Sequence, residues 1–154
     1  MARMTVEAGE ELTGTLERLD ASMRRGGIRR IVEAGAKVAV DEMRAAIANH
    51  HVSPGGGSMR DSTGMAEYHE TLEGGEVSVY PQGTDNRGVR NALKAFVINY
   101  GLGNNPTTRS RGRREANKTG DKFITGQFNR TKPRVQEAME AEAHRIFEEA
   151  RNGG

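Results

Sequence analysis

Residues 27–49 read GIRRIVEAGAKVAVDEMRAAIAN and have the clearest helical spacing in the chain. Their apolar and small residues recur at steps of three and four, so they share one face of a helix. These residues are Ile28, Ile31, Val32, Gly35, Val38, Ala39, Met43, Ala46 and Ile47. No proline interrupts the stretch, and Ser53-Pro54-Gly55 follows its end. We therefore predict a long helix against which the rest of the chain packs.

Two other helices are predicted before and after this one. Residues 1–26 form an N-terminal helical segment, with a helix over 6–23 whose leucines follow a helical step: Leu12, Leu16 and Leu19. Gly26-Gly27 is then expected to break the chain before the long helix. Near the other end, Thr131 is expected to cap a C-terminal helix with Pro133 in its first turn. Its apolar stripe consists of Val135, Ala138, Met139, Ala143, Ile146, Phe147 and Ala150. A small apolar group precedes it: Phe123, Ile124 and Phe128.

A hairpin and a shorter helix are predicted between the long helix and the C-terminal one. Residues 52–64 are rich in glycine and predict a loop. Segments 66–73 and 76–82 then flank Gly74-Gly75, a two-residue turn typical of hairpins. Asp85-Asn86 can cap a helix over 87–100, although 94–100 also fits a strand. The helix would carry an apolar stripe of Val89, Leu93, Phe96, Val97 and Tyr100.

The expected fold class is α+β, with a small antiparallel β-sheet packed against a long α-helix and a C-terminal α-helix. The length of 154 residues predicts a single domain over residues 1–154. Leu, Ile, Val and Phe together make up 26 residues, and there is no Trp. A core of this composition is small for the chain length, which favours burial of further apolar surface between subunits. We therefore expect a homo-oligomer.

The sequence also indicates where the protein is made. It has no cysteine, which excludes disulfides and thiolate metal sites and is typical of a reducing compartment. It has no apolar run of about 18 residues and no N-terminal pattern of a signal peptide. We expect synthesis in the cytoplasm and no membrane contact.

One basic segment stands out from a chain of modest net charge. Residues 105–134 carry nine Lys/Arg and two Asp/Glu, whereas the whole chain has a net charge of +2. Within it, 102–121 is predicted to be a long basic loop. Its candidate DNA-contacting or channel-facing residues are Arg109, Arg111, Arg113, Arg114 and Lys118. Aromatic residues are not interleaved with them, so stacking on single-stranded bases is not indicated. The alternatives are a solvated loop or pairing with an acidic neighbour.

The sequence contains only weak matches to the residue patterns of catalytic, cofactor-binding and metal-binding sites. His50 and His51 are adjacent, unlike the i, i+4 pair that shares a metal, and His69 and Asp61 complete no ligand spacing. Gly55-Gly56-Gly57-Ser58 lacks the lysine and the strand–helix context of a phosphate-binding loop. We therefore predict that the protein is not an enzyme and has no catalytic residues, no cofactor and no metal site.

Four short segments, in this order, resemble segments of a protein family of long-tailed bacteriophages. They are Ala39–Ile47 (AVDEMRAAI), Ser58-Met59-Arg60-Asp61-Ser62, Phe96-Val97-Ile98-Asn99-Tyr100-Gly101 and Lys122-Phe123-Ile124. Together with the hairpin, they are similar to the tail-assembly proteins of the head–tail neck, called neck, head–tail joining or tail-completion proteins. The resemblance covers residues 28–150. In the family an acidic residue is usual at the position of Asn99, and a proline at that of Lys122.

This resemblance implies a structural virion protein at the head–tail junction. Its copies would form an oligomeric ring, commonly a hexamer, that joins or completes the tail around the DNA channel. The implied partners are other neck and tail proteins and, through backbone contacts, packaged DNA. The alternative is a DNA-binding accessory protein that uses the basic loop 109–118 on free DNA.

Overall fold

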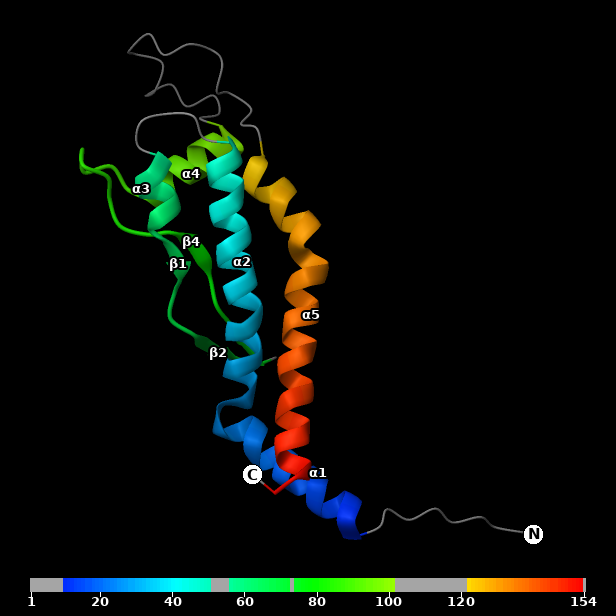
Figure 1. Cartoon of the computed structure of the whole chain (residues 1–154). Coiled ribbons are helices and arrows are strands. Elements are labelled where there is room, and N and C mark those ends of the chain that lie inside the picture. Colours follow the sequence, from blue (N-terminus) through cyan, green and yellow to red (C-terminus); the bar gives the residue numbers. More distant parts are fainter. Residues whose placement is uncertain (1–9, 51–55, 73, 102–121, 154) are drawn as a thin grey trace.

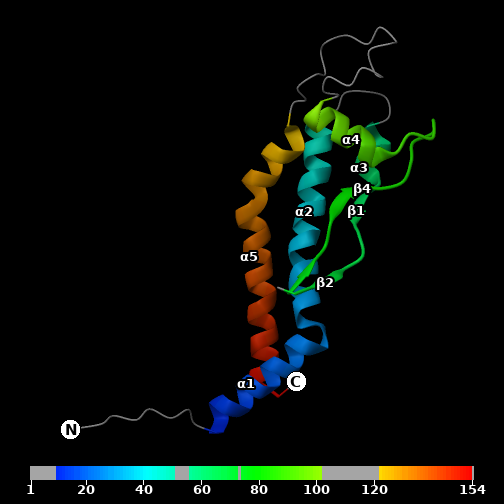
Figure 2. The same cartoon turned by 180° about the vertical axis from the view of Figure 1, so that it is seen from behind.

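The computed structural model describes residues 10–50, 56–72, 74–101 and 122–153. It contains the helices α1 (Glu10–Ser22), α2 (Ile28–His50), α3 (Gly56–Asp61), α4 (Asn91–Tyr100) and α5 (Phe123–Arg151). The strands are β1 (Thr63–Met65), β2 (His69–Thr71), β3 (Gly74–Glu76) and β4 (Val79–Pro81). The long helices α2 and α5 lie side by side, and the strands run along α2 (Figures 1 and 2). The predicted α+β class is confirmed.

Gly26 separates α1 from α2, as the sequence predicts. Its φ of 107° lies in the left-handed region, which glycine adopts without the penalty of a Cβ atom. The chain therefore turns at Met23–Gly27, and α1 crosses the C-terminal end of α5 (Figure 1). There the Arg18 guanidinium donates a hydrogen bond of 2.6 Å to the carbonyl oxygen of Ala150.

Small residues and ion pairs hold α2 against α5. A Cβ atom on Gly35 would lie only 2.7 Å from Cγ of Met139, so glycine permits this close approach. Arg30 of α2 pairs with Glu142 at 2.8 Å and with Glu149 at 2.9 Å, both on α5. Hydrogen bonds from Arg145 and Arg30 hold the pKa of the Glu142 carboxyl below its usual value, although burial opposes this.

The four strands form one hairpin with an irregularity in the middle. Thr63 pairs with Pro81, and His69 pairs with Glu76, both in antiparallel register. Between these ladders, residues 66–68 face only residues 77 and 78, so the first arm contains one extra residue, as in a β-bulge.

The predicted position of the hairpin turn is wrong. Gly74 pairs with Thr71 and Gly75 with Glu70 inside the β2–β3 ladder, so Gly74-Gly75 lie in a strand and not in the turn. The Tyr68 ring lies against Gly75, where a larger residue would collide with it, and its hydroxyl donates to the Gly74 carbonyl at 3.4 Å. The absence of a side chain at Gly75 therefore allows the Tyr68 ring to pack against the strand.

Two further boundaries differ from the prediction. Gly56–Asp61, expected within a loop, forms the short helix α3. Helix α5 begins at Phe123, eight residues before the expected cap Thr131, and Pro133 lies in its interior. Thr131 is buried, and its hydroxyl donates to the Gln127 carbonyl oxygen one turn earlier, at 2.8 Å. The apolar group before Thr131 extends the helix, because it packs against the core.

Helix α4 is shorter than the predicted helix over 87–100. Residues 94–100 are helical, which confirms the helix and excludes the alternative strand. Helix α4 begins at Asn91, because Asp85 caps a turn before it and not the helix itself. The Asp85 carboxylate accepts hydrogen bonds from the amides of Arg87 at 2.9 Å and Val89 at 2.8 Å, and it also pairs with Lys94.

The buried apolar core is small. Among the described residues it consists of Ala36, Val40, Ala46, Ile47, Met59, Ala95, Ile146 and Ala150. Half of these eight are alanines, which bury little area each. The largest cluster lies where α2, α3 and α4 meet: it contains Ile47, Met59 and Ala95, with Met43, Ile98, Phe123 and Ile124 packed against them.

Asn99 of α4 provides the cap that α5 lacks in its own sequence. Its Oδ1 accepts hydrogen bonds from the amides of Ile124 at 3.0 Å and Thr125 at 3.2 Å, and its side chain is buried. Asn99→Ala would leave these donors unpaired, so we expect a loss of about 1–3 kcal/mol in unfolding free energy. Denaturant titration measures this, with Asn129→Ala on the exposed face of α5 as the control.

The conservative variant sharpens this test. Asn99→Asp keeps the acceptor and places a negative charge at a helix N-terminus, so it should retain more stability than Asn99→Ala. A loss for Asn99→Ala no greater than that of the Asn129 control would contradict the capping role.

Asp85 is expected to make the free energy of unfolding depend on pH in the acidic range. The hydrogen bonds from Lys94 and from the Val89 and Arg87 amides lower its pKa to about 2. Its contribution is therefore complete above the unfolded-state pKa of about 4 and is lost as the pH falls towards 2. The difference in unfolding free energy between wild type and Asp85→Asn should shrink over that range. Asp41→Asn, on the exposed side of α2, is the control, and a difference that stays constant would contradict this account.

Candidate functional site

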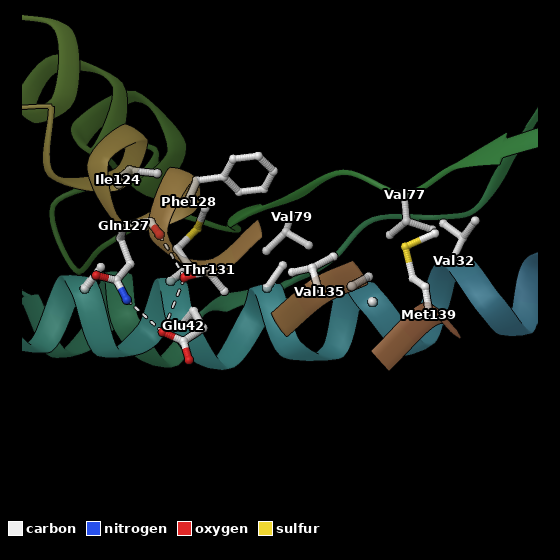
Figure 3. Close-up of a pocket in the computed structure, with 15 residues that line it drawn as sticks. Val32, Glu42, Val77, Val79, Ile124, Gln127, Phe128, Thr131, Val135 and Met139 are labelled. Carbon is white, nitrogen blue, oxygen red and sulfur yellow. Dashed lines mark hydrogen bonds between the residues drawn. The ribbon is translucent and has the colours of Figure 1, made fainter. Parts of the chain in front are cut away.

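An apolar groove runs along α2, between the hairpin and α5 (Figure 3). We call it the groove. Its floor consists of small α2 residues: Gly35, Ala36, Ala39 and Ala46. These short side chains fill little space, and a cavity of about 230 Å³ remains above them.

The walls of the groove come from the hairpin on one side and α5 on the other. Val77 and Val79 form the hairpin wall, and the α5 wall contains Ile124, Phe128, Val135 and Met139. Most of these side chains are half-buried, and Phe128 is 53% exposed. The lining is thus mainly apolar, with Gln127 and Thr131 as polar residues of the α5 wall, and it is not fully covered by the chain itself.

A single acidic residue interrupts the apolar lining. The Glu42 carboxylate accepts a hydrogen bond of 2.7 Å from the Gln127 amide and pairs with Arg134 of α5. Since the carboxylate is already engaged by these α5 side chains, it serves to join the two helices. The Thr131 hydroxyl also lies 3.5 Å from this carboxylate, so the polar atoms of the lining contact one another and the rest of the lining is mainly apolar.

A second uncovered apolar surface lies on α4. Leu93, Phe96 and Tyr100 are 54%, 57% and 56% exposed, and the rings of Phe96 and Tyr100 lie 4.9 Å apart. We call these three residues the α4 stripe. They lie away from the buried face of the helix, which carries Asn91, Ala95 and Asn99. A stripe at i, i+3 and i+7 is the pattern by which a helix binds an apolar partner.

The predicted DNA-contacting residues lie outside the described residues. These are Arg109, Arg111, Arg113, Arg114 and Lys118. The described chain stops at Gly101 and resumes at Lys122, and both ends are held at the end of α4. The Gly101 amide donates to the Val97 carbonyl at 2.8 Å, and the Lys122 amide donates to the Asn99 carbonyl at 3.0 Å.

The residues considered for metal binding are not gathered by the described fold. Asp61 and His69 are exposed, and the His50 side chain and residue His51 lie outside the described part. Within the described ranges, no three histidine or carboxylate side chains are close enough to hold a metal ion.

The sequence identified the groove and stripe residues as apolar but not their exposure. Val32 and Ala39 were predicted to face a core and line the groove, and Met43 lines the groove while also packing against the core cluster. Leu93, Phe96 and Tyr100 were expected to pack inwards, whereas Asn91 and Asn99 occupy the buried face of α4. The available signal was the excess of small residues on one face of α2.

The four segments that carry the family resemblance meet in space. Ile47, Met59, Ile98 and Phe123, one from each segment, belong to the same core cluster. This arrangement gives the four short patterns a shared packing role, since each supplies a side chain to one contact region.

Comparison of the chain with protein-family models, curated proteins and solved structures finds no match. No helix in the described part of the chain is long and apolar enough to cross a membrane.

Filling the groove should stabilise the isolated chain. Ala39→Leu places three more carbon atoms in the cavity, so we expect a gain of about 1 kcal/mol in unfolding free energy. Ala45→Leu makes the same change on the exposed side of α2 and should have nearly no effect. Thermal and denaturant unfolding of both variants measures the difference. A loss of stability confined to Ala39→Leu would show that the space above Ala39 is already filled.

Proposed function

We propose that the protein is a structural subunit of the head–tail neck of a long-tailed bacteriophage, where its copies form a ring that joins or completes the tail around the DNA channel. The observation that carries this proposal is the presence of two separate uncovered apolar surfaces, the groove and the α4 stripe, on a chain with a small core. Apolar surfaces of this kind mark sites of protein association.

The packing of the described residues gives the proposal further support. Core side chains come from all four segments that resemble the neck family, so the patterns belong to one folded unit. A ring built from identical subunits needs two different, mutually complementary surfaces on each copy. The groove is concave and the α4 stripe lies on a helix, and both are available on a single chain.

Packaged DNA is the second proposed partner. The basic residues 109–118 would neutralise its phosphates without reading its bases. The described residues that flank this segment, Gly101 and Lys122, lie at the end of the molecule where α4 and the first turn of α5 meet.

The test is assembly of phage particles in the absence of the protein. We expect filled heads and separate tails that do not join, and purified protein added to the mixture should restore infectious particles. Electron microscopy of restored particles should show several copies in a ring at the junction. Restored joining with no ring density, or normal particles without the protein, would contradict the proposal.

The basic segment is tested in the same assay. The variant Arg109→Ser, Arg111→Ser, Arg113→Ser and Arg114→Ser should fold and form the ring but retain DNA poorly. A variant with unchanged infectivity would show that these residues do not contact DNA. Conversely, strongly salt-dependent DNA binding by a monomer, with normal joining in its absence, would favour the accessory DNA-binding protein.

A further inference from the structure

We propose that the α4 stripe of one copy docks in the groove of a second copy of the chain. This inference rests on the proposed function, because it supplies the contact between neighbouring subunits of the ring. It assigns Phe96, the middle residue of the stripe, to the cavity above Ala39.

The dimensions of the two surfaces agree. The groove follows α2 from Val32 to Ala46, a distance of about 21 Å at about 1.5 Å per residue. Helix α4 has 10 residues and is therefore about 15 Å long. Its anchors at i, i+3 and i+7 all point to one side, which is how an amphipathic helix lies along an apolar groove. The groove is thus long enough for the α4 stripe to lie along it, with the side chains of the stripe directed into the cavity.

The charges beside α4 and beside the hairpin wall of the groove are opposite, whereas exposed basic residues flank the α5 wall: Arg130, Lys132 and Arg134. Arg87 and Arg90 are exposed next to the start of α4. Glu70 and Glu76 are exposed on the hairpin, and Glu76 directly precedes Val77 in the groove wall. Opposite charges around an apolar contact increase the association rate and fix its orientation. The basic end of α4 is therefore expected to face the hairpin of the neighbour.

The stripe of a given copy cannot occupy that copy's own groove. The opposite face of α4 is buried in the same chain, and Asn99 also bonds the first turn of α5. When two copies dock, the groove of the first copy and the stripe of the second copy remain free to bind further copies. Such head-to-tail contacts produce a closed ring when the rotation between copies closes.

Cysteine cross-linking tests the contact directly, since the chain has no cysteine of its own. One protein carries Leu93→Cys on the stripe, and another carries Phe128→Cys at the edge of the groove. Treating their mixture with a short bis-maleimide should give covalent dimers. As a matched control, Ala45→Cys on the exposed side of α2 replaces Phe128→Cys. A chain with both Leu93→Cys and Phe128→Cys should give a ladder of oligomers that ends at the ring size.

Two blocking variants make the test specific. Ala39→Leu fills the groove and Phe96→Ser removes the central anchor, and each should reduce cross-linking about tenfold or more. Ala45→Leu and Leu72→Ser alter exposed positions elsewhere and should leave it unchanged. Circular dichroism and unfolding midpoints confirm that each variant is folded.

The outcomes separate this inference from the proposed function. Yields equal to the Ala45→Cys control, or yields insensitive to both blocking variants, would overturn the docking contact. If rings are nevertheless present in particles, the proposed function stands with a different contact. Specific cross-links in a protein that particles do not need would support the contact and reject the neck assignment.

Discussion

The small residues on α2 are the constraint on which the other layers depend. Gly35 lets α5 approach so closely that Met139 occupies the place of a side chain. Ala36 and Val40, which lie outside the predicted stripe, are buried as well, so α2 is covered over more than one face. Short side chains bring neighbouring layers near but bury little apolar area, and hydrophobic stabilisation is roughly proportional to that area. The same residues thus account for both the close α2–α5 contact and the groove.

Polar contacts fix the arrangement where apolar burial is limited. Asn99 joins α4 to the first turn of α5, and Asp85 fixes the turn before α4. Exposed ion pairs contribute only about 0–1 kcal/mol each, so Arg30 mainly sets how α2 and α5 align. Glu142 differs because it is buried, and removal of its arginine partners would leave a charge without compensation. Directional bonds therefore specify the fold more than its small core does.

The sequence predicted elements well where helical spacing is long, and boundaries poorly where tertiary contacts intervene. α2 and the Gly26 kink follow from apolar periodicity and glycine conformation. The start of α5 did not follow, because its cap comes from Asn99 on another helix and no local signal marks it. The hairpin turn was misplaced because Gly74 and Gly75 lie within the strand ladder, where they contact the Tyr68 side chain. The exposure of the α4 stripe could not be predicted from the sequence either, because an exposed apolar stripe has the same spacing as a buried face.

The proposed ring contact and the proposed DNA contact are neighbours along the chain. Lys122, where the described chain resumes after the basic segment, is two residues from Ile124 in the groove wall. The Asn99 cap fixes this same turn of α5. A neighbour docked in the groove would stabilise the turn, because a ligand that binds only the folded state favours it by mass action. Under the proposed assembly, ring formation would therefore stabilise the turn of α5 that follows the basic segment, whereas the ring itself would not depend on DNA contact.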